Sequence, residues 1–246
     1  MRLVLFDIDG TLLLAGPACT GSLREAIQRT YQVDRLTDGY RFGGKTDPQI
    51  VVELAAAAGV APETVSAGLD DALQLYLDLM KQRLPADSRP RLLPGVKDLL
   101  GRLEEDDGFT VGLLTGNLED GARQKLAYFD LNRFFPFGAY GSDSADRSDL
   151  PAVALERARE FAGRTFAPSE AVVVGDTEHD VRIARQSGLI SLAVATGSRT
   201  VEYLAEFGSD HVFPDFSETE TVLSALRDGT GNRSQISPDL SKAREL

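Results

Sequence analysis

The chain has 246 residues, of which 42% are hydrophobic and 26% are charged, and this composition excludes an intrinsically disordered protein. Its single cysteine, Cys19, excludes a disulfide framework and a cysteine zinc cluster, and its two histidines argue against a multi-histidine metal site. The net charge of −12 predicts no nucleic-acid or membrane-surface partner. No apolar run approaches the roughly 20 residues of a membrane span, and Asp7 and Asp9 interrupt the N-terminal apolar run, which disfavours a signal peptide. We therefore expect a cytoplasmic protein.

Short apolar runs rich in β-branched residues alternate with longer helical patterns along most of the chain. The runs are continuous, as in parallel strands that are covered on both faces. They predict strands at Arg2–Phe6, Thr110–Leu114, Ala171–Val174, Ile190–Val194 and Val212–Phe213. The patterns between them predict helices at Gly95–Glu105, Leu118–Tyr128, Leu150–Ala162, Thr177–Ser187 and Thr200–Phe207. This alternation is typical of an α/β protein with a doubly wound parallel sheet of the Rossmann-like type.

One segment, from Thr20 to Leu84, contains helical patterns only. We predict three helices there, at Gly21–Tyr31, Pro48–Ala58 and Pro62–Leu84, and a return hinge at Pro85–Pro94. The sequence thus predicts an all-helical cap (residues 16–87) inserted into a core (residues 1–15 and 88–230). The polar composition of residues 231–246 predicts a mobile tail.

Asp7 and Asp9 follow the first predicted strand and precede Gly10. Side chains two residues apart leave a strand on the same side, and ligands of open α/β sheets bind beyond the carboxyl ends of the strands. Two like charges held close together need a compensating cation or proton. Gly10 permits the sharp turn that directs both carboxylates into a crevice. Two solvated turn carboxylates are the alternative, which the preceding apolar strand makes less plausible.

Two further predicted strands also end in polar residues. Thr115, Gly116 and Asn117 offer a hydroxyl, an accessible backbone amide and a side-chain amide, which suit anion binding, although Thr115 alone is also a helix cap. Asp176 and Asp180 face one site if a helix begins near Thr177. A set of carboxylate ligands at a phosphate site favours Mg²⁺ over zinc.

These motifs occur in a recognisable order: Asp-x-Asp-Gly-Thr at 7–11, the strand-end Thr115, and Gly-Asp-x-x-x-Asp at 175–180. Together they resemble the haloacid dehalogenase superfamily, and within it the group of phosphoglycolate phosphatases and β-phosphoglucomutases, which carry a helical cap. The resemblance spans about Met1 to Arg227. It implies a Mg²⁺-dependent phosphatase that hydrolyses a small phosphorylated metabolite, phosphoglycolate-like or a sugar phosphate, through an aspartyl phosphate.

The resemblance also assigns roles to the four aspartates. Asp7 would be the nucleophile. Asp9 would protonate the leaving oxygen and later deprotonate the attacking water. Asp176, one oxygen of Asp7 and the backbone carbonyl of Asp9 would hold Mg²⁺, and Asp180 would bind the ion directly or through water.

One residue departs from the family pattern, which places a lysine before the helix that precedes the third motif. No lysine occurs there in this chain, and Arg147 is the substitute that we expect to be catalytic. Arginine keeps its charge and binds phosphate and carboxylate in a bidentate manner. The alternative is that Arg147 pairs with Asp146 or Asp149 on the surface.

The substrate contacts implied by the resemblance lie on two loops. Thr115 and the Gly116 amide would hold the phosphoryl oxygens, next to Asn117. Lys45 and Thr46 lie in a glycine-containing loop of the cap that faces the active site in similar enzymes, and there they would contact the leaving group. A simple loop with a helix N-cap explains Lys45 and Thr46 equally well.

Two other functions remain open from the sequence. A phosphomutase of the same architecture shares Asp7, Asp9 and Asp176, so these motifs do not distinguish it from a phosphatase. A non-catalytic binding or regulatory module is the second alternative, supported only by the missing lysine. The sequence leaves a monomer and a homodimer equally open.

Overall fold

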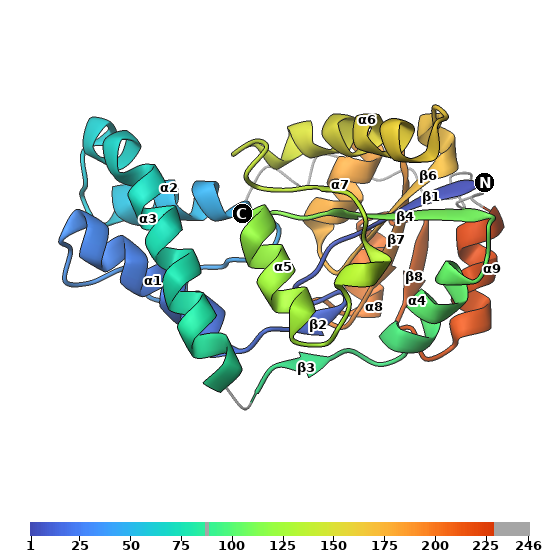
Figure 1. Ribbon diagram of the computed structural model, residues 1–246, viewed down its shortest axis with the longest axis horizontal. Helices are drawn as coiled ribbons and strands as arrows, with labels where there is room; N and C mark the ends of the chain where they lie inside the picture. Colours follow the sequence, from blue (N-terminus) through green and yellow to red (C-terminus); the bar gives the residue numbers. More distant parts are fainter. Residues whose placement is uncertain (87–88, 229–246) are drawn as a thin grey trace.

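A six-stranded parallel sheet forms the centre of the protein in the computed structural model, which describes residues 1–86 and 89–228 (Figure 1). The strand order is β5-β4-β1-β6-β7-β8. The bounds are β1 Arg2–Phe6, β4 Phe109–Leu114, β5 Gly138–Ala139, β6 Ala171–Gly175, β7 Ile190–Val194 and β8 His211–Phe213. The predicted doubly wound α/β fold is confirmed, whereas the predicted mobile tail lies outside the described residues.

Helices cover both faces of this sheet because alternate residues of its central strand point to opposite sides. Val4 and Phe6 of β1 pack in one apolar cluster, and Leu3 and Leu5 pack in another. The first cluster includes α4 (Val96–Glu104), α5 (Glu119–Ala127) and α9 (Thr219–Asp228). The second includes α6 (Leu150–Ala162) and α7 (Glu178–Gln186), while α8 (Val201–Glu206) packs in a third cluster with β7.

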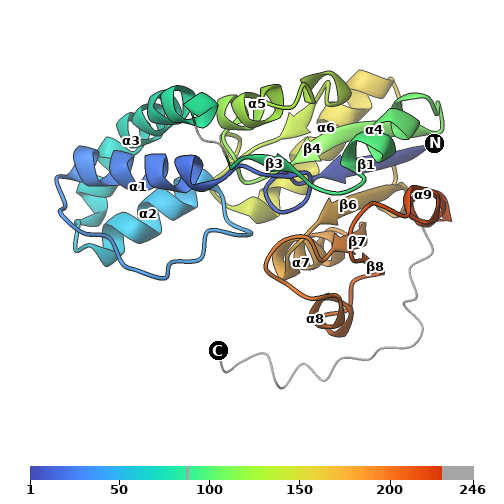
Figure 2. The ribbon, with the colours of Figure 1, turned by 90° about the horizontal axis from the view of Figure 1, so that it is seen from below.

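Three helices form the inserted segment, on the side of the sheet where β1 ends (Figures 1 and 2). They are α1 (Pro17–Tyr31), α2 (Asp47–Ala57) and α3 (Pro62–Arg83). Both connections to the core pair with one another, because β2 (Leu13–Leu14) and β3 (Arg91–Leu92) form a two-stranded antiparallel sheet. No helix in the described ranges is both long and apolar enough to cross a membrane.

The structure corrects the predicted elements in a few places. Helix α1 begins at Pro17 rather than at Gly21, because a proline at the first helical position has its backbone preset for a helix. The sequence analysis missed β2, β3 and β5, each only two residues long, which is too short for a periodic pattern. It also missed α9.

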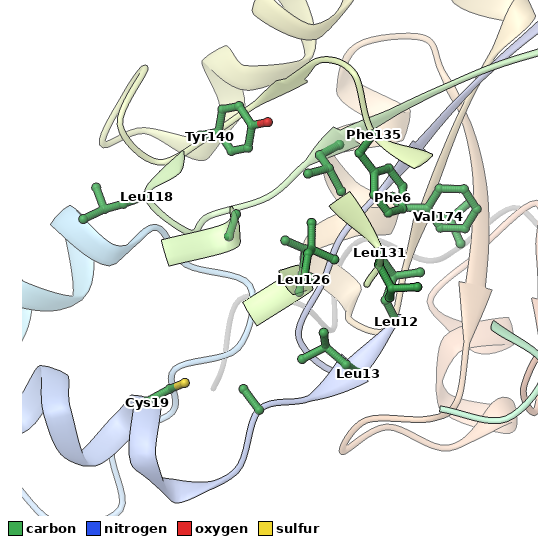
Figure 3. Packing of buried hydrophobic residues seen from close by; sticks show 14 of the residues in the cluster. Phe6, Leu12, Leu13, Cys19, Leu118, Leu126, Leu131, Phe135, Tyr140 and Val174 are labelled. Atoms are coloured by element: carbon green, nitrogen blue, oxygen red, sulfur yellow. The ribbon is translucent and has the colours of Figure 1, made fainter. Parts of the chain in front are cut away.

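Aromatic packing below the end of β1 supports the strand that carries Asp7. The Phe6 ring is fully buried and meets the rings of Phe135 and Phe216 edge-on, at centroid distances of 6.1 and 6.3 Å. Figure 3 shows Phe6 and Phe135 side by side among aliphatic side chains. Edge-to-face pairs of this kind stabilise a core beyond their buried area. The first catalytic candidate therefore directly follows one of the largest fully buried side chains among the described residues.

Phe6→Ala should lower the free energy of unfolding by about 3–5 kcal/mol, because it leaves a cavity that its aromatic neighbours cannot fill. Urea denaturation followed by circular dichroism measures the change. Phe161→Ala is the matched control, since that phenylalanine is 59% exposed and its removal should cost no more than about 0.5 kcal/mol. Equal losses in the two variants would contradict this account of the core.

Candidate active site

Three buried carboxylates meet at the carboxyl edge of the sheet. Asp7 directly follows β1, Asp176 directly follows β6, and Asp180 lies in the first turn of α7. One oxygen from each lies within 4.8 Å of the others, and all three residues are buried. Adjacent parallel strands bring Asp7 and Asp176 together, since the Asp7 amide donates to the Val174 carbonyl of β6 at 2.9 Å. The arrangement has the ligand type and spacing of a cation site.

The turn after Asp9 depends on Gly10. This residue has φ +85°, a left-handed conformation that favours glycine. A side chain at Gly10 would also overlap the Asp176 carboxylate. The Gly10 amide donates to the Leu13 carbonyl at 2.9 Å, which closes the turn. Just before this turn, the Asp9 carboxylate accepts hydrogen bonds from Asn117 and Lys125 and is not one of the three clustered carboxylates.

Arg147 lies among the carboxylates, where the family pattern places a lysine. It belongs to a short 3₁₀ turn, Arg147–Asp149, just ahead of α6. Its Nη2 lies 2.5 Å from Asp180 Oδ1 and 3.5 Å from Asp7 Oδ2. Among the described residues, its buried Nε has no hydrogen-bond partner. Its ion pairs are therefore with the buried carboxylates, and one donor is left for a ligand.

The Asp180 carboxylate is already engaged on both oxygens. Oδ1 accepts from Arg147, and Oδ2 accepts from the amide and the hydroxyl of Thr177 at 3.0 and 2.7 Å. The Thr177 contacts form a capping box that fixes the first turn of α7. Asp180 thereby orients Arg147 and also places its own charge close to Asp176.

The acidic cluster carries more negative charge than Arg147 compensates. Burial, and then the nearby Asp180 and Asp7 carboxylates, raise the pKa of Asp176 to about 8. Burial also raises the pKa of Asp7 to about 6, although Arg147 opposes the shift. At neutral pH a divalent cation would replace the proton that this value implies on Asp176.

The predicted anion-binding residues after β4 lie next to this cluster. Thr115 is fully buried, and its side chain hydrogen-bonds to Asp7, which lowers the pKa of that carboxyl. Asn117 Nδ2 donates to Thr115 Oγ1 at 2.8 Å and to Asp9 Oδ2 at 2.9 Å. Gly116 has no room for a side chain, because the backbone of Lys45 in the cap lies against it.

Lys125 is a site residue that the sequence analysis missed. Its side chain is only 5% exposed, and its Nζ donates to Asp9 Oδ2 and to Asn117 Oδ1, both at 2.6 Å. Burial alone would lower the pKa of Lys125, but the surrounding acidic groups, Asp9 foremost, hold it well above its ordinary value. The available signal was a lysine on the buried face of α5, between Ala122 and Leu126.

The cap loop reaches the core through Thr46 and Asp47. Thr46 is fully buried, caps α2 by accepting from the Gln49 amide at 3.2 Å, and donates to the Ala145 carbonyl at 2.7 Å. Thr46 is not among the residues that line the cavity described below. The Asp47 carboxylate, also missed, accepts from the Leu118 amide at 2.9 Å, at the start of α5. Burial raises the pKa of Asp47 to about 6.

A cavity of about 400 Å³ lies between the cap and the core. Asp7, Asp9, Thr115, Gly116, Asn117, Lys125 and Arg147 line it from the core. Lys45 lines it from the cap and is ion-paired with Glu53, and its ammonium lies 4.4 Å from the ring centre of Tyr40. The remaining cap lining is mostly apolar and includes Leu23, Ile50 and Tyr76. This volume suits a small molecule.

Comparison with known proteins places the chain in a family. The family model of haloacid dehalogenase-like hydrolases matches residues 1–188. The protein belongs to this family. The resemblance seen in the sequence is thus confirmed, as is the predicted enzyme class, a phosphoric monoester hydrolase.

Curated relatives and solved structures agree with this assignment. A phosphoglycolate phosphatase of Mesorhizobium japonicum is 28% identical over 222 residues, which covers 90% of this chain and 94% of that protein. A phosphoglycolate phosphatase of Synechococcus elongatus is 30% identical over 203 residues, which covers 80% of this chain and 85% of that protein. The fold matches a structure from Haemophilus somnus, provisionally assigned as a phosphoglycolate phosphatase, with a TM-score of 0.66, 20% identity and coverage of 91% and 98%. A Thermotoga maritima structure provisionally assigned as a β-phosphoglucomutase matches with a TM-score of 0.58 and 18% identity. That match covers 92% of this chain and 100% of the other chain.

Asp176→Asn should stabilise the metal-free protein at high pH. Because Asp7 and Asp176 have raised pKa values in the folded state, the folded protein binds more protons than the unfolded chain, and stability falls as pH rises from about 4 through about 8. In EDTA at pH 8.5 the variant should therefore melt above the unmodified protein, by about 2–4 °C for each kcal/mol gained. Near pH 4 the difference should vanish.

Thermal melts across this pH range, with and without Mg²⁺, measure the effect. Added Mg²⁺ should raise the melting temperature of the unmodified protein more than that of Asp176→Asn. Asp107→Asn, at an exposed position, is the control and should show no pH-dependent difference. A variant that melts below the unmodified protein in EDTA at pH 8.5 would show that Asp176 is satisfied without a cation.

Proposed function

We propose that this protein is a Mg²⁺-dependent phosphatase that hydrolyses a small phosphorylated metabolite through an aspartyl phosphate on Asp7. The observation that carries the proposal is the buried Asp7 carboxylate next to Arg147, whose Nε has no partner among the described residues. A buried guanidinium donor without an acceptor fits an oxyanion such as a phosphoryl group. Thr115, which hydrogen-bonds to Asp7, would supply a hydroxyl for the same group.

The acidic cluster fits Mg²⁺ by the chemistry of its donors. Asp7 and Asp176 offer carboxylate oxygens whose pKa values are raised by burial first and by the neighbouring carboxylates second. Asp9 would contribute its backbone carbonyl. Both oxygens of Asp180 are engaged by Arg147 and Thr177, which favours contact with the ion through water. Bound there, Mg²⁺ would neutralise charge on the carboxylates and the phosphoryl oxygens.

The side chains divide the reaction between them. An Asp7 oxygen attacks phosphorus and forms the new P–O bond as the bond to the leaving oxygen breaks. Asp9 gives its proton to that leaving oxygen, so the product departs as a neutral alcohol. In the second step Asp9 takes a proton from water, the water oxygen attacks phosphorus, and Asp7 is released with inorganic phosphate. Arg147 stabilises the phosphoryl charge throughout.

The substrate is a small phosphomonoester, phosphoglycolate-like or a sugar phosphate. The cavity of about 400 Å³ supports this size, and the relatives named phosphoglycolate phosphatase support the class. Lys45, on the cap side of the cavity, would contact the leaving group.

Asp7→Asn tests the proposal directly. The unmodified protein should release inorganic phosphate from phosphoglycolate or from a member of a sugar-phosphate panel with Mg²⁺, and EDTA should abolish the release. Asp7→Asn should lower kcat by at least about 10³-fold, because the nucleophile is lost. Beryllium fluoride with Mg²⁺, a mimic of the aspartyl phosphate, should raise the melting temperature of the unmodified protein but not of Asp7→Asn. Full activity in Asp7→Asn would refute the covalent mechanism.

Arg147→Met should lower kcat/KM by about 10²–10³-fold, the usual cost of removing one charged donor from a transition state. Arg147→Lys should recover part of this loss, because it restores the charge without the planar fork. Steady-state kinetics with the best substrate of the panel provide the measurement. Arg157→Met, which removes an arginine of α6 outside the cavity lining, is the control. Equal activity of Arg147→Met and the unmodified protein would place Arg147 outside the chemistry.

A further inference from the structure

The two carboxylates that follow β1 have different cationic partners. Asp7 faces Arg147, whereas Asp9 pairs with Lys125 from α5, a helix that follows a different strand. The Asp9 side chain is 42% exposed and lines the cavity, while that of Lys125 is 5% exposed. A partly exposed carboxylate is thus paired with a buried ammonium. Desolvation of that ammonium is unfavourable unless it is fully hydrogen-bonded.

The hydrogen bonds around Asp9 converge on one of its two oxygens. Lys125 Nζ donates to Oδ2 at 2.6 Å, and Asn117 Nδ2 donates to the same oxygen at 2.9 Å. Lys125 Nζ also donates to Asn117 Oδ1, so the two donors brace each other. Asn117 Nδ2 is fixed in turn by donating to Thr115 Oγ1. This network leaves Oδ1 as the Asp9 oxygen without a hydrogen bond from the described residues.

We propose that Lys125 is a positioning residue that, with Asn117, holds Asp9 through Oδ2 and so presents Oδ1 to the leaving group and to water. Because Oδ2 accepts hydrogen bonds from both Lys125 and Asn117, Oδ1 is the oxygen left to contact the reacting groups. During phosphoryl transfer the proton that the general acid supplies passes from Oδ1 to the leaving oxygen as the P–O bond breaks. The role rests on the proposed phosphatase reaction.

This role predicts a dependence on the leaving group. A general acid accelerates the departure of a basic alkoxide strongly, but a weakly basic phenolate departs without protonation. The parameter kcat/KM covers only the steps up to transfer of the phosphoryl group to Asp7, so hydrolysis of the intermediate does not obscure it. Benzyl phosphate and 4-nitrophenyl phosphate are suitable probes, because each carries one uncharged substituent built on a six-membered aromatic ring. Benzyl alkoxide needs a proton to depart, whereas 4-nitrophenolate departs as the anion.

Lys125→Met is the test variant, since methionine keeps the apolar stem and removes the charge. We expect it to lower kcat/KM for benzyl phosphate by about 10²-fold and for 4-nitrophenyl phosphate by less than about 5-fold. Asp9→Asn should show the same selectivity, at least as strongly. Arg123→Met removes a cation from the same helix without touching Asp9, and should leave the ratio of the two kcat/KM values unchanged.

Each outcome decides the role of Lys125. A purely structural role would lower both kcat/KM values by the same factor. An unchanged ratio of the two values would therefore overturn the positioning role of Lys125. If Lys125→Met fails to fold, Asn117→Ala removes the other donor to Oδ2 and must shift the ratio in the same direction. Absence of any Mg²⁺-dependent phosphate release by the unmodified protein would overturn the proposed function itself, and this role with it.

Discussion

The structure is organised around buried negative charge at the carboxyl edge of a parallel sheet. Asp7, Asp176 and Asp180 each place one oxygen within 4.8 Å of the others, and Arg147 is ion-paired with Asp7 and Asp180. Such a cluster is tolerable only where the backbone holds it rigidly and a ligand compensates it. Buried apolar strands and the capping box of α7 provide the rigidity. Arg147 provides part of the compensation, and the proposed Mg²⁺ would provide the rest. Burial, together with the neighbouring carboxylates, is what raises the pKa values of Asp7 and Asp176.

Asp7 and Asp9 show how one strand end yields two chemically different carboxylates. Asp7 is buried in the acidic cluster with Arg147, which suits its proposed role as the nucleophile. Asp9 lines the cavity, where Lys125 and Asn117 hold one of its oxygens. Identical side chains two residues apart thus have different surroundings, which fit the different steps proposed for them.

The sequence predicted those features that follow from local rules. Residues at the carboxyl ends of parallel strands must meet, so Asp7, Asp176 and Thr115 were identified from strand pattern alone. Lys125 was not, because its contact with Asp9 depends on which side of α5 faces the sheet end. Asp47 was not singled out, since its partner, the Leu118 amide, is 71 positions further along the chain. The β2–β3 pair was missed because each strand is only two residues long.

Asp47 and Lys125 connect the cap to Asp9, the proposed acid–base group, through one helix. Helix α5 begins where the Asp47 carboxylate accepts from the Leu118 amide, a bond that replaces the side-chain cap that the helix itself lacks. Seven residues after Leu118, the same helix delivers Lys125 to Asp9. The Asp47 amide and the Thr46 hydroxyl add two further cap–core bonds, to Gly116 and Ala145. Separation of the cap from the core would break all three bonds and leave the start of α5 uncapped. The orientation of Asp9 and the position of the cap over the cavity therefore both depend on helix α5.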